Sequence, residues 1–136
     1  MTVARIALSL ALGVNLSQAL AAQPGGAPAD EIRTPAERFA PHPYKSAMDT
    51  LANYQSCGMH ARAADLAALT AELRSIESLA RAKGLGPTLE RLRQDYLDLL
   101  AISSRVACAG GATAALANAR RAMADFRTWV ADQPAR

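Results

Sequence analysis

Aromatic and β-branched residues are scarce in this chain of 136 residues, in which Phe, Trp and Tyr together make up only 4%. These are the residue types that β-strands favour, so their scarcity argues against a sheet. Alanine, the strongest helix former, supplies nearly a quarter of the sequence instead. The composition therefore predicts an all-α protein. It also predicts a thin core, because alanine buries little area, and a small domain of that kind usually needs a covalent staple or a partner.

The motifs that would indicate an enzyme or a bound cofactor are missing as well. No G-x-S-x-G or C-x-x-C-H sequence occurs, and Gly110 with Gly111 lacks the lysine of a phosphate-binding loop. Carboxylates have basic partners four residues away, which is typical of surface ion pairs and not of a catalytic acid pair. We therefore expect a protein that is not an enzyme and holds no cofactor. The pairs with this spacing are Glu77 with Arg81, Arg91 with Asp95 and Arg121 with Asp125.

Long apolar runs are absent except near the N-terminus, where residues 1–21 have the order of a secretory signal peptide. Arg5 is the only charge before Asp30, and the apolar run from Ile6 to Leu16 matches an h-region but is too short to cross a bilayer. Small side chains at Ala19 and Ala21 suit a signal peptidase, and cleavage one residue later is the close alternative. An amphipathic helix is the other interpretation. We predict a periplasmic or secreted protein with no membrane span after cleavage.

The charge balance argues against a nucleic-acid partner. The formal net charge is +3 for the full chain and one unit less once Arg5 is removed with the signal peptide. Nucleic-acid binders show a stronger basic excess that is gathered on one face. We therefore expect no nucleic acid among the partners.

Residues 22–45 predict a flexible, proline-rich arm. Five of the seven prolines and the Gly25-Gly26 pair fall in this segment, which has almost no apolar periodicity. Phe39, His42 and Tyr44 are the side chains suited to docking its last turn onto the domain, while His42 itself is expected to lie in the mobile part.

Residues 46–132 predict a small antiparallel, up-down bundle of three to four helices, because four segments repeat apolar residues at spacings of three and four. Ser46 with Asp49 resembles a capping box, and Lys83 with Gly84 resembles a basic last turn followed by a C′ glycine. Pro87 is expected to open the third helix at N1, its first helical position. Three long helices with a helical arm is the main alternative. The core-facing positions are expected to be Ala47, Leu51 and Tyr54; Leu66, Leu69, Leu73, Ile76 and Ala80; Leu89, Leu92, Tyr96, Leu99 and Val106; and Leu116, Ala119, Met123, Phe126 and Val130.

The connections between these segments are short, and two of them are marked by glycine. Continuing the apolar stripe of the first helix into the second would place Asp65 and Glu72 in the seam, so we expect a break between Gly58 and Arg62. The third helix is expected to end near Cys108, before Gly110 and Gly111.

Cys57 and Cys108 are the only two cysteines, and after export they would meet in an oxidising compartment. In an up-down bundle the ends of the first and third helices share a pole, which brings both thiols together. We therefore predict one structural disulfide, Cys57–Cys108. A redox-active or metal-binding pair is the alternative, although neither cysteine lies in a C-x-x-C motif.

Met59 and His60 are the only weak candidates for metal ligands, since thioether and imidazole suit copper or haem iron. Adjacent residues point in different directions, and no histidine follows His60 to serve as a second axial ligand. We therefore predict no metal site. A small-ligand or metal/haem-binding bundle, with a cavity near Tyr54, Met59, His60 and Tyr96, remains the alternative function.

The last helical segment carries an arginine- and tryptophan-rich set that is typical of protein interfaces: Arg120, Arg121, Arg127 and Trp129. A solvated face on which Trp129 closes the end of the bundle is the alternative. Taken together, the sequence predicts an exported, non-enzymatic protein-interaction module of the cell envelope, such as an adaptor, assembly factor, chaperone or inhibitor. Its partner is expected to be another envelope protein or a second copy of the chain.

Overall fold

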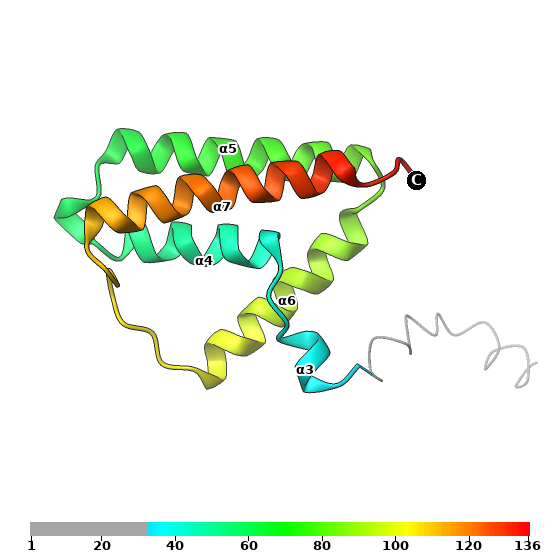
Figure 1. Ribbon diagram of the computed structural model, residues 1–136, viewed down its shortest axis with the longest axis horizontal. Coiled ribbons are helices and arrows are strands. Elements are labelled where there is room, and N and C mark those ends of the chain that lie inside the picture. Colours follow the sequence, from blue (N-terminus) through cyan, green and yellow to red (C-terminus); the bar gives the residue numbers. More distant parts are fainter. Residues whose placement is uncertain (1–32) are drawn as a thin grey trace, which may run out of the picture. The chain divides into compact units, whose positions relative to one another are not determined.

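The computed structural model describes residues 33–136, and every element among them is helical (Figure 1). The predicted all-α bundle with one disulfide is confirmed. The predicted signal peptide and residues 22–32 of the predicted arm lie outside the described residues. The elements are α3 (Pro35–Arg38), α4 (Pro43–Gln55), the 3₁₀ turn η1 (Gly58–His60), α5 (Ala63–Ala82), α6 (Gly86–Ile102) and α7 (Ala112–Asp132).

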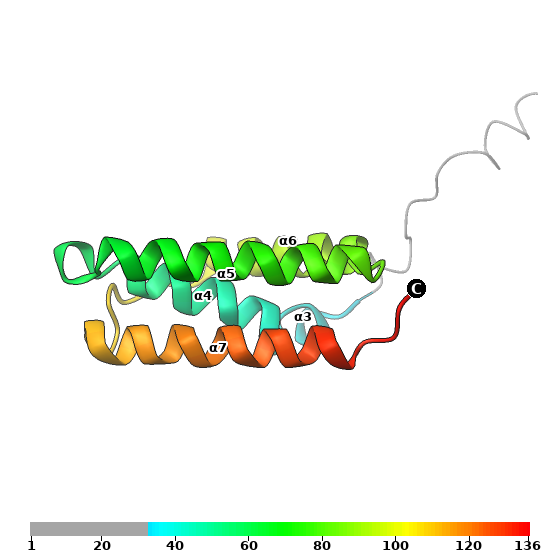
Figure 2. The ribbon, with the colours of Figure 1, turned by 90° about the horizontal axis from the view of Figure 1, so that it is seen from above.

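The core lies between α4, α5 and α7, whose axes run roughly alongside one another, whereas α6 diverges from α4 (Figures 1 and 2). Successive long helices alternate in direction, as predicted for an up-down bundle. The α4–α7 interface is the most extensive, and α6 packs less closely on the rest. Most of the predicted core-facing positions are buried, whereas Leu51, Leu66, Leu73, Leu99 and Leu116 are only half-buried. Fully or almost fully buried are Ala47 and Tyr54; Leu69, Ile76 and Ala80; Leu89, Leu92 and Tyr96; and Ala119, Met123, Phe126 and Val130.

The predicted capping box at Ser46 is wrong, because α4 begins three residues earlier. The Ser46 amide already donates to the carbonyl of His42, at 2.9 Å, so Ser46 lies inside the helix. His42 is the N-cap: its Nδ1 accepts a hydrogen bond from the Tyr44 amide at 3.0 Å, and Pro43 follows at the first helical position. The last residues of the predicted arm therefore belong to the domain, and Tyr44 is fully buried.

The two predicted breaks around α5 are confirmed. Between α4 and α5 the chain turns through η1, and the Arg62 amide donates to the Tyr54 hydroxyl at 2.8 Å. At the other end, Lys83 is the C-cap of α5 and Gly84 has a φ of +82°, which glycine adopts without strain.

The third helix, α6, begins at Gly86, one residue before the predicted Pro87. The predicted helix is too long at its C-terminus, because α6 ends at Ile102. Ser103 is extended, and its hydroxyl donates to the Leu99 carbonyl, which competes with a further helical turn. Residues 103–111 form an irregular segment, here called the connector, that returns the chain to the end of α4. Val106, predicted to face the core, is instead 74% exposed in this segment.

The predicted disulfide joins Cys57, just after α4, to Cys108 in the connector, across a sequence separation of 51. Cys108 therefore does not close α6 as expected, but it reaches the predicted pole through the connector. No helix in the 33–136 region is long and apolar enough to cross a membrane.

Candidate functional site

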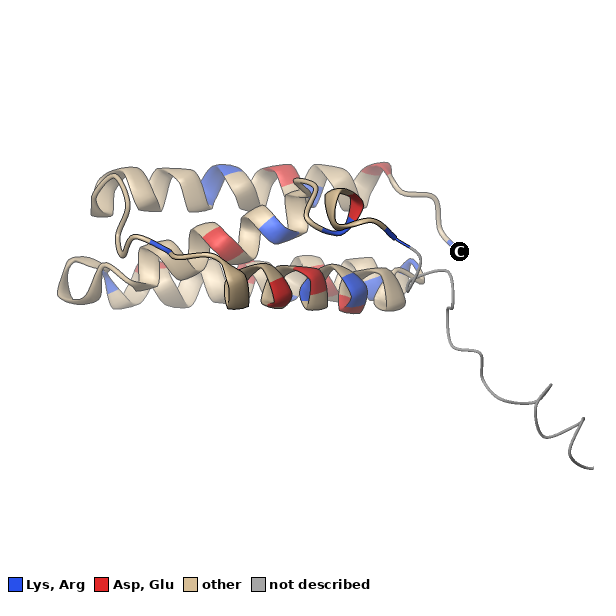
Figure 3. Cartoon of the chain, turned by 90° about the horizontal axis from the view of Figure 1, so that it is seen from below, with Lys and Arg blue, Asp and Glu red and all other residues tan. Residues whose placement is uncertain are grey.

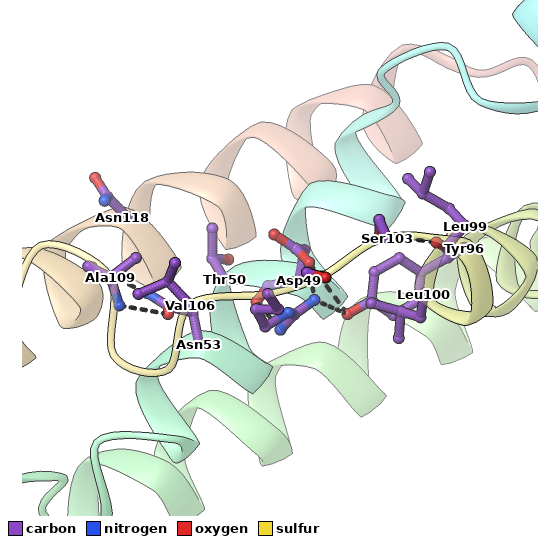
Figure 4. Close-up of a pocket in the computed structure, with 12 residues that line it drawn as sticks. Asp49, Thr50, Asn53, Tyr96, Leu99, Leu100, Ser103, Val106, Ala109 and Asn118 are labelled. Carbon is purple, nitrogen blue, oxygen red and sulfur yellow. Dashed lines mark hydrogen bonds and ion pairs between the residues drawn. The ribbon is translucent and has the colours of Figure 1, made fainter.

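A cleft of about 470 Å³ lies between α4, the C-terminal half of α6 and the connector (Figure 4). Its floor comes from α4, its outer wall from α6, and the connector closes one side. The lining residues are Asp49, Thr50 and Asn53 of α4; Tyr96, Leu99 and Leu100 of α6; Ser103, Ser104, Arg105, Val106 and Ala109 of the connector; and Asn118 of α7.

A polar cluster of three side chains holds the connector across the cleft. Arg105 forms an ion pair with Asp49 and donates to the Tyr96 hydroxyl at 2.8 Å. The Tyr96 hydroxyl in turn donates to Asp49 at 3.3 Å. Burial raises the pKa of Tyr96, while its hydrogen bond with Arg105 acts in the opposite direction. Because the three residues come from α4, α6 and the connector, the cluster fixes the walls of the cleft relative to one another.

The far end of the connector is tied to α4 by a second set of contacts. The Asn53 side chain donates to the Ala109 carbonyl at 3.3 Å and accepts from the Ala109 amide at 2.9 Å. The Ser56 hydroxyl accepts from the Cys108 amide at 2.6 Å, next to the disulfide. A segment without regular structure is thus held at both ends.

Large aliphatic side chains remain exposed beside this cleft. Ile102 is 73% exposed and Val106 is 74% exposed, while Leu97 on the preceding turn of α6 is 49% exposed. Ile102 and Val106, together with Leu99 and Leu100 in the cleft wall, form what we call the α6 surface. Leu97 lies on the other side of α6 from Leu99 and is not part of it. The residues lining the cleft include no histidine or cysteine, and Ser103 spends its hydroxyl on the Leu99 carbonyl. The aliphatic part of the lining suits contact with apolar side chains.

A second, smaller pocket of about 390 Å³ lies at the C-terminal end of α4, where α5 and α7 begin. It contains Tyr54 and His60, whereas Tyr96 lines the first cleft and Met59 is 92% exposed and lines neither. The four residues of the expected ligand cavity therefore do not share one cavity. Within the described part of the chain, no group of three or more His, Cys, Asp or Glu side chains could hold a metal ion, and Cys57 is in the disulfide.

The arginine and tryptophan residues predicted to bind a partner are not gathered on one surface. Arg120 pairs with Asp65 of α5 at 3.3 Å, and Arg127 pairs with Glu72 of α5 at 3.4 Å. At 3.6 residues per turn, Trp129 lies on the other flank of α7.

There Trp129 is partly buried, with its ring centroid 6.2 Å from that of Phe126 and 4.6 Å from that of His42. Arg121 is exposed on the outer face of α7. Acidic and basic residues are interspersed along the helices in the view of Figure 3. The set therefore divides into two α5–α7 ion pairs, an outer arginine and a tryptophan that covers the start of α4.

A buried polar cluster that the sequence did not reveal joins α4, α5 and α6. Glu77, interpreted from its spacing as a surface partner of Arg81, is 8% exposed. It accepts hydrogen bonds from the Tyr44 hydroxyl at 2.7 Å and from Arg93 at 3.0 Å, whereas Arg81 stands 3.8 Å away. Burial raises the pKa of Tyr44 to about 12, and the hydrogen bond from Arg93 opposes this shift. The cluster holds three helices together and opens into neither of the pockets described above.

Comparison of the chain with known protein families, with curated proteins and with solved structures finds no significant match in any of the three.

Proposed function

We propose that this chain is an exported, non-enzymatic protein-binding module of the cell envelope, and that its partner contacts the α6 surface. The observation that carries the proposal is the exposure of two aliphatic side chains, about three quarters each: Val106, which lines the cleft, and Ile102, the last residue of α6. Export is supported by the order of residues 1–21, and the disulfide is compatible with an oxidising compartment.

The chemistry of the α6 surface favours a protein partner with apolar side chains. Exposed aliphatic residues that cluster beside a cleft are uncommon on monomeric proteins and often mark interaction sites. The apolar wall around Leu99 and Leu100 can receive such side chains, while Asp49 and Arg105 lie at the polar edge that would orient them. Because the connector is already fixed by its disulfide and hydrogen bonds, binding would order few additional residues, which lowers its entropic cost.

Site-specific photocrosslinking in the native cells tests this proposal. A photoreactive amino acid is placed at Val106 in one variant and at Ala124, exposed on the outer face of α7, in a control. We expect a discrete covalent adduct with another protein from Val106 and none from Ala124. An adduct with the mass of two copies of the chain would identify the partner as the chain itself. No adduct from Val106, or the same adduct from both positions, would contradict the proposal.

A further inference from the structure

His42 occupies a position that requires an uncharged imidazole. Its Nδ1 accepts the hydrogen bond that caps α4, at 3.0 Å from the Tyr44 amide. A protonated ring carries a hydrogen on both nitrogens and cannot accept this bond. The ring also stands edge-on to Trp129 of α7, with centroids 4.6 Å apart and planes at 77°, so it cannot turn away without losing that contact.

The charged groups around His42 also disfavour an imidazolium ion. Burial lowers its pKa to about 4, and the positive charges of Lys45 on α4 and Arg91 on α6 act in the same direction. From α7 the ring meets the uncharged indole of Trp129.

The segment that ends at His42 begins with α3, which acts as a strap against α6. Arg38 pairs with Asp98 and lies 3.6 Å from the buried Asp95, both on α6. The Lys45 ammonium donates to the Arg38 carbonyl at 3.0 Å. Ion pairs that are partly open to solvent are weak individually. The position of α3 therefore also depends on the His42 N-cap, which fixes the chain where it enters α4.

We propose that His42 is an acid-sensitive latch, whose protonation removes the N-cap of α4 and releases the α3 strap from α6. The imidazolium turns its Nδ1 hydrogen away from the Tyr44 amide and moves toward solvent, away from Lys45 and Arg91. The indole of Trp129 loses its edge-on neighbour, while the core of α4, α5 and α7 stays folded. This inference is independent of the proposed function.

The fluorescence of Trp129, the only tryptophan, reports the latch in the purified, disulfide-bonded mature chain. Between pH 7.5 and pH 3.5 we expect a step in emission with a midpoint near pH 4. His42→Asn removes the titrating group but keeps a good N-cap, so its emission should show no such step. His60→Gln changes the only other histidine, and this control should keep the step of the wild type.

Release of the strap is measured with a glutamate-specific protease that is active in acid, by following cleavage after Glu37 of α3. Loss of an N-cap corresponds to an increase of about fivefold in the open population. Because about half of the His42 side chains are protonated at pH 4, the wild type should be cut about threefold faster than His42→Asn at that pH. At pH 7 the two should be cut at equal rates. A comparison at one pH removes the protease's own pH dependence.

Three outcomes would overturn the latch. The first is an emission step that persists in His42→Asn, which would show that another group causes it. The second is the absence of a step in the wild type, and the third is equal cleavage of both proteins at pH 4. If circular dichroism shows that His42→Asn is less helical than the wild type, the pKa of His42 is measured instead by NMR, from the imidazole ring signals of the wild type. The proposal requires His42 to titrate well below the reference value of 6.5, and titration near 6.5 would refute it.

Discussion

Glu77 and Glu72 lie on the same helix, and each has an arginine within 3.4 Å, yet their surroundings differ. The side chain of Glu77 is 11% exposed and that of Glu72 is 36% exposed. Glu77 accepts from Tyr44 and Arg93, which come from two other helices. When a buried acceptor is removed, its hydrogen-bond donors are left without a partner. When a surface ion pair is broken, water takes the place of the lost partner.

We expect Glu77→Gln to lower the free energy of unfolding by about 1–3 kcal/mol, because a neutral amide accepts less strongly from Arg93 and brings its own donors. The matched change Glu72→Gln should cost less than about 0.5 kcal/mol. Urea unfolding followed by circular dichroism measures both. Equal effects of the two substitutions would show that the buried cluster contributes no more than a surface pair.

His42 gives stability a pH dependence with a definite sign. Its pKa is about 4 in the folded chain against a reference of 6.5, so between these values the unfolded chain binds the proton more tightly. The contribution is fully present above pH 6.5, is lost as the pH falls toward 4, and does not change further below that. Partial solvent exposure reduces the effect to about 1–2 kcal/mol. Urea midpoints at pH 7 and pH 4 should differ more for the wild type than for His42→Asn, and equal differences would contradict this account.

Which of these residues the sequence can reveal depends on how far apart the partners are. Leu69, Ile76 and Ala80 follow helical periodicity, so their burial could be predicted from α5 alone. The burial of Glu77 could not, because its partners Tyr44 and Arg93 lie 33 and 16 residues away. From local spacing only Arg81 could be predicted as a partner of Glu77, and it lies farther from the Glu77 carboxylate than Arg93 does.

At the scale of elements, long-range contacts decided where α6 ends. Apolar spacing alone predicted that the third helix continues to Val106, because Ser103 and Ser104 are only a weak signal for the end of a helix. The connector is held in place by Asn53 and Cys57 of the α4 end, more than fifty residues earlier in the chain. By contrast, Gly84 marked the end of α5 locally, because its positive φ is one that other residues adopt only with strain.

The disulfide should contribute strongly to stability, since it closes a loop with a sequence separation of 51. On chain-entropy grounds such a loop is worth at most about 4 kcal/mol. We expect replacement of both Cys57 and Cys108 by serine to lower the free energy of unfolding by about 2–4 kcal/mol. Hydrogen exchange should speed up most in the connector, at Arg105 and Val106. Unchanged urea stability together with unchanged exchange would contradict this prediction.

Lys83 joins the end of α5 to the end of α7. Its ammonium donates to the carbonyls of Val130, Ala131 and Gln133, at 2.9–3.0 Å, where the helix dipole favours a positive charge. We expect Lys83→Gln to cost about 1–2 kcal/mol and to loosen the last turn of α7. Arg74→Gln, on the exposed face of α5, is the charge-matched control. The prediction fails if both substitutions have the same effect on the melting temperature.

At the scale of the whole molecule, the fold was far more predictable than the candidate site. The bundle could be predicted from helical periodicity, which many residues share, and from one pair of cysteines, which a covalent bond joins. The candidate site depends on the divergence of α6 from α4 and on a connector without regular structure, neither of which leaves a pattern in the sequence. The residues predicted for partner binding lie on α7, whereas the exposed apolar residues Ile102 and Val106 lie at the end of α6 and in the connector.

The most direct test of the proposed function is recovery of the partner from the native envelope fraction by three purified mature proteins. They are the wild type, a variant with Ile102→Asp and Val106→Asp, and the control Leu79→Asp, which changes an apolar residue of α5 that is 50% exposed. Circular dichroism first establishes that all three are equally helical. We predict that wild type and Leu79→Asp retain the same protein in similar amounts and that the double variant retains at least about tenfold less. Equal recovery by the double variant would contradict the proposal that the α6 surface binds the partner.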